Sequence, residues 1–141
     1  MPPYSMEHTV MEADATIKAI YSYVRDNAEN FDAYRMETEI DKHLKELGVV
    51  LLKLYFAAKG TGDVGETLTL EDGSVLKREK GLRERTLFSV FGKLEVPRTC
   101  YRVKGRAGIM PLDAQANLPD RSYSYLLREF MDLPGVDFRI R

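Results

Sequence analysis

Seven side chains near the middle of the chain have the chemistry needed to bind phosphate groups. Six are arginines or lysines, whose charged N–H groups pair with phosphate oxygens, and the seventh is a tyrosine that can hydrogen-bond beside them. These residues are Arg83, Arg85, Arg98, Tyr101, Arg102, Lys104 and Arg106. The pattern predicts a DNA-binding β-hairpin, and an ordinary solvated strand face is the alternative interpretation.

The charge of the chain is distributed unevenly along its length. The 141 residues carry a formal net charge of only −1. Residues 77–106 nevertheless contain ten Lys and Arg against three Glu, whereas residues 1–76 contain seven against fourteen acidic residues. A polyanion would therefore be attracted to one region of a slightly acidic molecule.

Other kinds of chemistry find little support in the sequence. The single cysteine, Cys100, allows no internal disulfide and lacks the companions that a thiolate zinc site requires. We find no phosphate-binding loop and no nucleophile beside a base, so we expect no cofactor, no metal and no enzyme activity. No apolar run reaches the roughly 18–20 residues of a membrane span, and the N-terminus does not resemble a secretory signal. We therefore expect a cytoplasmic protein without a membrane partner.

Residues 1–62 are predicted to form a helical N-terminal region. The first helix is expected to begin at Thr9, because Thr9 and Glu12 have the spacing of a capping box, and to run to about Ala28.

A long amphipathic helix is predicted over residues 32–59, capped by Asn30 or Asp32 and ended by Gly60. Between residues 49 and 56 nearly every side chain is apolar, so we expect this end to be buried on all sides. Apolar residues recur along one stripe at spacings of three and four. They are Met36, Ile40, Leu44, Leu47, Leu51, Leu54 and Ala58. This stripe either packs on the protein's own sheet or forms the seam of a homodimer.

Residues 63–108 are predicted to form a basic antiparallel β-hairpin region. Asp72-Gly73 predicts a type I′ turn between strands at 66–70 and 74–77, because that turn requires positive φ at both central residues.

A second hairpin is predicted from strands at 85–91 and 93–103, which turn at Gly92. Pro97 has no N–H to donate, so its strand is expected at a sheet edge or at a bulge.

Residues 109–141 are predicted to form a turn-rich segment, a short C-terminal helix and a tail. Ser122 is expected to cap the helix over 123–131, and Pro134-Gly135 to end it. The whole chain is thus predicted to be α+β. It has N-terminal helices including one long amphipathic helix, two antiparallel β-hairpins forming a small sheet, and a C-terminal helix.

Several short motifs follow one another across residues 81–131. They are Gly-x-Arg, a Thr-x-x-x-x-Phe-Gly turn, a Val-x-Arg-x-x-Tyr-Arg strand, Pro-x-Asp, Asn-Leu-Pro and Tyr-Ser. The residues concerned are Gly81, Arg83, Thr86, Phe91, Gly92, Val96, Arg98, Tyr101, Arg102, Pro111, Asp113, Asn117, Leu118, Pro119, Tyr123 and Ser124. This order resembles the N-terminal region of the ISKra family of bacterial insertion-sequence transposases, over roughly residues 30–131.

The resemblance implies a bacterial protein that binds DNA, and a parent enzyme whose catalytic carboxylate triad binds divalent metal in a later RNase H-like domain. That domain has no counterpart here, so we expect a non-catalytic fragment of a truncated or frameshifted element. Some relatives carry a Cys-x-x-Cys zinc knuckle where this chain has residues 103–108 without cysteine, so zinc is not expected. The alternative is a structural or interaction module whose long helix mediates self-association or docks a catalytic domain.

Overall fold

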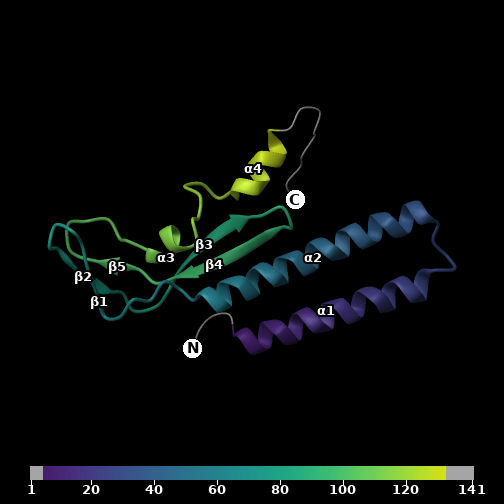
Figure 1. Ribbon diagram of the computed structural model, residues 1–141, viewed down its shortest axis with the longest axis horizontal. Coiled ribbons are helices and arrows are strands. Elements are labelled where there is room, and N and C mark those ends of the chain that lie inside the picture. Colours follow the sequence, from purple (N-terminus) through teal and green to yellow (C-terminus); the bar gives the residue numbers. More distant parts are fainter. Residues whose placement is uncertain (1–4, 133–141) are drawn as a thin grey trace.

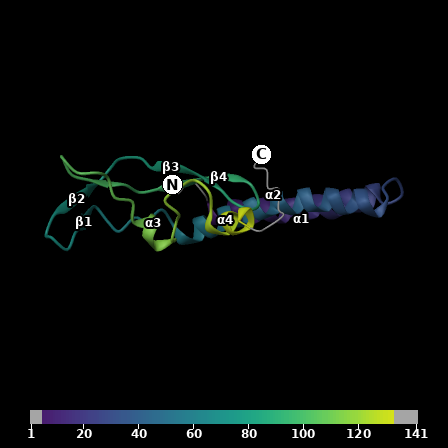
Figure 2. The same ribbon diagram turned by 90° about the horizontal axis from the view of Figure 1, so that it is seen from above.

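The computed structural model describes residues 5–132 and confirms the α+β fold class. Two long antiparallel helices, α1 (Met6–Asn27) and α2 (Ala33–Lys59), lie beside the strands, and the strand region extends past their open end (Figure 1). Seen from above, the molecule is elongated and narrow (Figure 2). The predicted helix stop at Pro134 and Gly135 lies outside the described residues.

The first helix begins earlier than predicted. Ser5, not Thr9, is its N-cap, because the Ser5 hydroxyl accepts a hydrogen bond from the His8 N–H at 3.3 Å. Thr9 lies one turn inside the helix, where its hydroxyl donates to the Ser5 carbonyl at 2.7 Å. With Ser5 as the N-cap, the helix has one more hydrogen-bonded turn, and the Thr9 hydroxyl still has a hydrogen-bond partner.

The second helix has the predicted extent but not the predicted burial. The Asp32 carboxylate accepts from the Arg35 N–H at 2.8 Å, and Gly60 ends the helix at φ +86°. The expectation of burial on all sides between residues 49 and 56 is wrong, because Leu51 and Tyr55 are exposed. The core side of α2 is formed instead by Val49, Leu52 and Phe56, which pack towards the strands.

The strands form two small sheets instead of one. Strands β1 (Thr67–Thr69), β2 (Val75–Arg78) and β5 (Tyr101–Arg102) pair in the order β1-β2-β5. Strands β3 (Arg83–Phe88) and β4 (Lys93–Arg98) pair only with each other.

The strand predicted over 93–103 is therefore divided between the two sheets. The chain turns at Thr99 and Cys100, whose backbone bonds leave the β3–β4 ladder: the Thr99 N–H donates to the Thr61 carbonyl, and the Cys100 carbonyl accepts from the Glu79 N–H. Pro97 lies at a sheet edge, as predicted, because β4 has no second neighbour to which a Pro97 N–H would donate.

The turn of the first hairpin is present but is not of type I′. Among the described residues, Asn117 is the one non-glycine residue with positive φ, so Asp72 does not adopt the conformation that type I′ requires. Gly73 has φ +87°, and its N–H donates to the Leu70 carbonyl at 2.9 Å. This geometry is that of a three-residue hairpin loop ending in a left-handed glycine.

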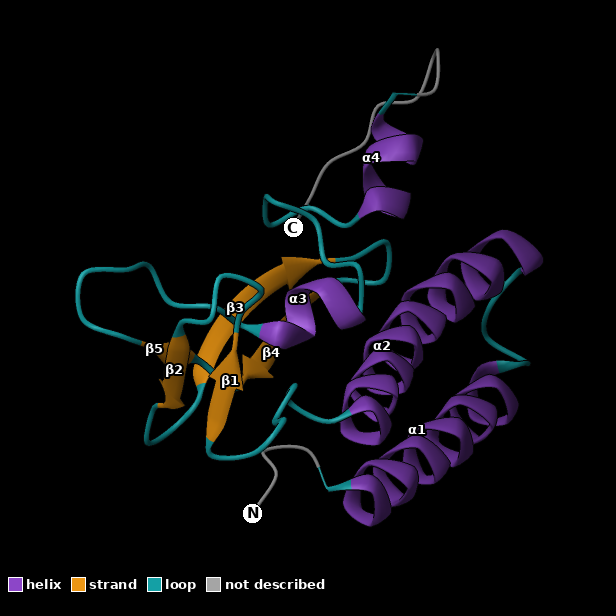
Figure 3. Ribbon diagram, turned by 60° about the vertical axis from the view of Figure 1, so that its left-hand side comes forward, coloured by secondary structure: helices purple, strands orange, loops and turns teal. Residues whose placement is uncertain are grey.

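The main hydrophobic core lies between α2, the β3–β4 pair and the short helix α3 (Pro111–Gln115). Its fully or nearly fully buried members are Phe56, Leu87, Leu94, Val96 and Leu112. The last helix, α4 (Tyr125–Met131), stands apart from the α1–α2 hairpin (Figure 3). Its N-cap is Ser124 and not Ser122, since the Ser124 hydroxyl accepts from the Leu127 N–H at 3.1 Å.

Two glycines at the end of α2 allow a test of how tightly this core is closed. Gly60 and Gly62 both have positive φ, but a Cβ at Gly62 would lie 2.6 Å from the Leu112 backbone nitrogen, whereas one at Gly60 would meet nothing. We expect Gly62→Ala to lower the free energy of unfolding by about 3 kcal/mol and the control Gly60→Ala by about 1 kcal/mol. Urea denaturation measures both, and equal losses would contradict close packing at Gly62.

Candidate nucleic-acid interface

Two of the seven predicted phosphate-binding residues, Arg85 and Arg98, point towards the inside of the fold. In the register of the β3–β4 pair, Arg85 lies opposite Val96 and Leu87 lies opposite Leu94. Alternate residues of a strand share a face, so Arg85 lies on the same face as the buried Leu87. Both arginines therefore stand at the border of the core instead of on the outer face of the hairpin.

Arg98 is held by a bidentate ion pair with Asp113 at the start of α3. One guanidinium nitrogen lies 3.0 Å and 2.8 Å from the two carboxylate oxygens. The Arg98 side chain is only 12% exposed. Arg85 donates to the carbonyl oxygens of Pro119 and Arg121, so it fastens the loop after α3 to the same strand pair.

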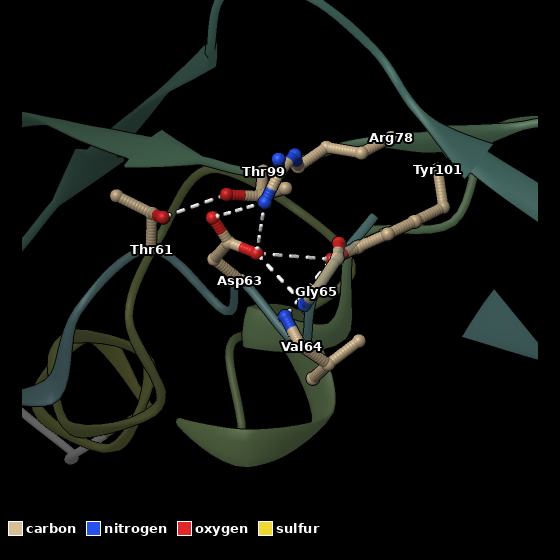
Figure 4. A network of polar contacts seen from close by, with 7 residues as sticks. All are labelled: Thr61, Asp63, Val64, Gly65, Arg78, Thr99 and Tyr101. Carbon is tan, nitrogen blue, oxygen red and sulfur yellow. Dashed lines mark hydrogen bonds and ion pairs between the residues drawn. The ribbon is translucent and has the colours of Figure 1, made fainter. Parts of the chain in front are cut away.

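Tyr101 is fully buried and cannot lie on a binding surface. Its hydroxyl accepts from the Val64 N–H at 2.8 Å and donates to the Gly65 carbonyl at 2.7 Å. The neighbouring Asp63 carboxylate accepts two hydrogen bonds from Arg78, at 2.8 Å and 2.9 Å (Figure 4). This network fixes the segment between α2 and β1 against β2 and β5.

The same segment carries a threonine pair and a shallow cleft. The hydroxyls of Thr61 and Thr99 lie 2.6 Å apart (Figure 4). A cleft of about 560 Å³ opens beside them, lined in part by Lys59, Arg78 and Glu79. Arg78 and Glu79 already have charged partners within the fold, so the cleft offers no isolated charge from either to a ligand.

Three further members of the predicted set, Arg83, Arg102 and Arg106, are exposed but paired with carboxylates. Arg83 and Arg102 converge on Glu79, with N–O distances of 3.0 Å and 2.9 Å. Arg106 pairs with Asp72 at 2.9 Å. Exposed ion pairs of this kind are weak, so a phosphate can compete with the carboxylate for the guanidinium.

Three of the acidic partners come from outside the basic stretch of sequence. Asp63, Asp72 and Asp113 all lie beyond residues 77–106, yet the fold places each against an arginine of that stretch. The positive field of the strands is therefore smaller than the sequence composition implies.

Asp63 and Glu79 are two of the carboxyl groups in these pairs whose pKa values lie below their ordinary range. Hydrogen bonds from the backbone of Gly65 and from Arg78 lower the pKa of Asp63. The hydrogen bond from Arg83 lowers the pKa of Glu79, and the charge of Arg102 acts in the same direction. Both groups stay ionised, so they partly neutralise the arginines under ordinary conditions.

Three lysines of the basic stretch remain without an ion pair among the described residues. They are Lys77, Lys80 and Lys104, all exposed. Lys77 lies opposite Arg102 in the β2–β5 register, so two positive side chains stand side by side on one sheet face. Of these lysines, only Lys104 belongs to the set predicted from sequence. Strand alternation around the apolar Leu76 is the sequence signal that places the neighbouring Lys77 on the outer face of β2.

No family model, curated protein or solved structure matches this chain. Within residues 5–132, no group of three or more His, Cys, Asp or Glu side chains is placed to hold a metal ion. In the same range, no helix combines the length and apolar character of a membrane span. The surfaces of the molecule and their charges are therefore the remaining guide to its function.

Substitutions of Arg98 and Arg83 test which of the two arginines stabilises the fold and which only lies on its surface. We expect Arg98→Gln to lower the free energy of unfolding by roughly 2 kcal/mol, because it leaves the partly buried Asp113 carboxylate with only the longer ion-pair contact to Arg85, at 3.9 Å. The control Arg83→Gln, at a side chain 49% exposed, should cost less than about 1 kcal/mol. Chemical denaturation measures both, and a small effect at Arg98 would exclude a scaffold role.

Titration of the Asp72 carboxyl tests whether the hydrogen bonds from Ser74 or the ion pair with Arg106 lower its pKa more. Hydrogen bonds from the Ser74 hydroxyl and N–H, and secondarily from Arg106, lower its pKa from 3.8 to about 2. Stability due to this shift is present above about pH 4 and is lost as pH falls through about 2. NMR titration should show Ser74→Ala raising the Asp72 pKa more than Arg106→Gln does. The reverse order would mean that the ion pair dominates.

Proposed function

We propose that this chain is a non-catalytic DNA-contacting region of the type found at the N-terminus of ISKra-family transposases. The observation that carries the proposal is the group of unpaired, exposed lysines on and beside β2 and β5. Lys77, Lys80 and Lys104 belong to this group, and Arg102 and Arg106 lie next to it. Lysines of this kind bind phosphate as point charges, without reading bases.

The structure narrows the set of contacts compared with the one predicted from sequence. Arg85, Arg98 and Tyr101 have partners inside the fold, so the proposal does not rely on them. Arg83, Arg102 and Arg106 would have to exchange a carboxylate for a phosphate. We therefore propose weak, sequence-independent binding to the DNA backbone, made specific in a parent transposase by other domains.

The non-catalytic part of the proposal rests on the resemblance. The carboxylate triad that it implies belongs to a domain outside the matched residues 30–131. Arg78, Arg98 and Arg102 of the described strands are held in ion pairs with carboxylates. Bacterial cytoplasm is the compartment that such a protein would occupy.

A second candidate function is an interaction module, and a different observation favours it. Both long helices carry large apolar side chains that remain exposed, among them Ile17, Tyr21, Leu44 and Leu51. These side chains suit contact with another protein and not with DNA.

A salt titration of duplex DNA binding tests the first proposal. With about three to five phosphate contacts, the slope of log K against log salt should lie between about −3 and −4.5. Replacing Lys77, Lys80 and Lys104 with Gln should reduce the magnitude of the slope by about 2–3.

The matched control replaces Lys18, Lys42 and Lys45 of the helices with Gln, an equal change in net charge. This variant should keep the slope of the unaltered protein. Absence of binding at low salt, or equal weakening by the two triple variants, would contradict a contact surface at the strands.

A further inference from the structure

A polar pocket of about 520 Å³ lies at the border of the core, between the β3–β4 pair and the segment that leads from α3 to α4. Arg85 and Arg98 line it from the strands, and Asp113 lines it from α3. The far wall is the loop that contains Pro119 and Arg121, whose carbonyl oxygens both accept hydrogen bonds from Arg85. Because these bonds hold the loop, the walls of the pocket are fixed by the fold itself.

The two strand arginines of this pocket share one carboxylate. Arg98 forms the bidentate ion pair with Asp113, and the nearest nitrogen of Arg85 lies 3.9 Å from the same carboxylate. The side chains of Arg85 and Arg98 are only 15% and 12% exposed. Two largely buried guanidinium groups thus face one negative charge, although buried charges are normally paired one to one.

The remaining charged groups near the pocket do not remove this excess. Glu84 precedes Arg85 in β3, so its side chain lies on the other face of the strand pair. Glu95 lies opposite the residue that follows Arg85, so it belongs to that other face too. Asp120 and Arg121 also line the pocket, and their opposite charges balance each other. The pocket therefore carries one excess positive charge.

Both strand arginines also have nitrogen atoms without an acceptor in the part of the chain that the structure describes. Arg98 donates through Nε to the Arg83 carbonyl and through Nη1 to Asp113, which leaves Nη2. Arg85 donates through Nη2, and its Nη1 is too far from Asp113 for a hydrogen bond, so Nη1 and Nε remain. These atoms are accessible, since the one buried side-chain nitrogen or oxygen without a hydrogen bond in residues 5–132 belongs to Arg128.

Phosphate is the anion that suits these donors best. A guanidinium presents its N–H groups in a planar fork that matches phosphate oxygens, and charge-assisted hydrogen bonds of this kind are strong. The pocket offers such groups from two strands, and the hydroxyl of Ser122 on the loop is a further donor. A tetrahedral phosphate accepts from several directions at once, whereas a carboxylate has two oxygens in one plane.

We infer that this pocket is a phosphate-binding site, in which one phosphate group supplies the negative charge that Arg85 and Arg98 lack. Its volume leaves room for a small organic group beside the phosphate. A phosphorylated small molecule and a DNA backbone therefore bring the same chemistry to it. The inference goes beyond the proposed DNA contacts, because Lys77, Lys80 and Lys104 do not line the pocket.

NMR titration of the whole chain with inorganic phosphate, at constant ionic strength, tests the inference. The Nε–H signals of Arg85 and Arg98 should shift with a dissociation constant of about 1–10 mM, as expected for a small anion held by a few charge-assisted hydrogen bonds. If neither signal shifts up to about 50 mM phosphate, the inference is wrong.

Three variants test whether the excess charge is responsible for binding. Asp113→Asn keeps an oxygen for Arg98 and removes the competing negative charge, so it should tighten phosphate binding by about threefold or more. Arg121→Gln should weaken binding about threefold, because it removes an exposed positive charge from the edge of the pocket. The control Arg25→Gln makes the same change in charge at an exposed arginine of α1 and should leave the dissociation constant unchanged.

Circular dichroism shows whether each variant is folded. If Asp113→Asn is not, the comparison of Arg121→Gln with Arg25→Gln decides by the same criterion of about threefold. Equal dissociation constants for these two arginine variants overturn the inference. Unchanged phosphate binding by a folded Asp113→Asn overturns it as well, because the carboxylate then does not compete with the ligand.

A second titration, with a short DNA duplex in place of inorganic phosphate, distinguishes the two sources of the phosphate group. Shifts of the Arg85 and Arg98 signals support a backbone phosphate as the ligand, and unmoved signals support a small phosphorylated molecule. The variant with Gln at Lys77, Lys80 and Lys104 should keep the phosphate dissociation constant of the unaltered protein. Failure of the phosphate site is thereby distinguishable from failure of the proposed DNA contacts.

Discussion

The ion pair between Arg98 and Asp113 fixes how α3 lies against the β3–β4 pair. Arg98 is the last residue of β4, and Asp113 lies in the first turn of α3. Their contact places α3 over the β3–β4 pair, where Leu112 completes the core around Phe56. The loop after α3 then runs within reach of Arg85, which holds it through two carbonyl oxygens. The arrangement from α2 to the start of α4 thus rests on this ion pair together with the burial of Leu112 and the hydrogen bonds of Arg85.

The motifs behind the transposase resemblance coincide with structural positions of this kind. Gly92 turns the β3–β4 hairpin at φ +144°, Asn117 adopts φ +48° after α3, and Ser124 caps α4. Arg98 and Tyr101 have partners inside the fold. The motif order therefore describes how this chain folds, and the proposed DNA contacts rest mainly on lysines outside it.

Part of this structure could be predicted from the sequence, because it depends on the conformational preferences of single residues. Asp32 and Gly60 bound the long helix because capping and left-handed conformation depend on single residues. The inward direction of Arg98 was not accessible, because it requires both the strand register and an acidic partner fifteen residues away. Burial of Tyr101 likewise follows from contacts with residues 64 and 65, far away in the sequence.

The passage of the chain from β4 directly into β5 has a consequence for folding cooperativity. Residues 93–102 belong to one sheet at their start and to the other at their end, so the two sheets share one continuous stretch of chain. The pairing of β2 with β5 also joins residues far apart in the chain, which makes it a late and slow contact. By contrast, α1 packs mainly on its sequence neighbour α2. The shared stretch couples the two sheets, whereas the local helical hairpin can form early and offer them a pre-formed surface.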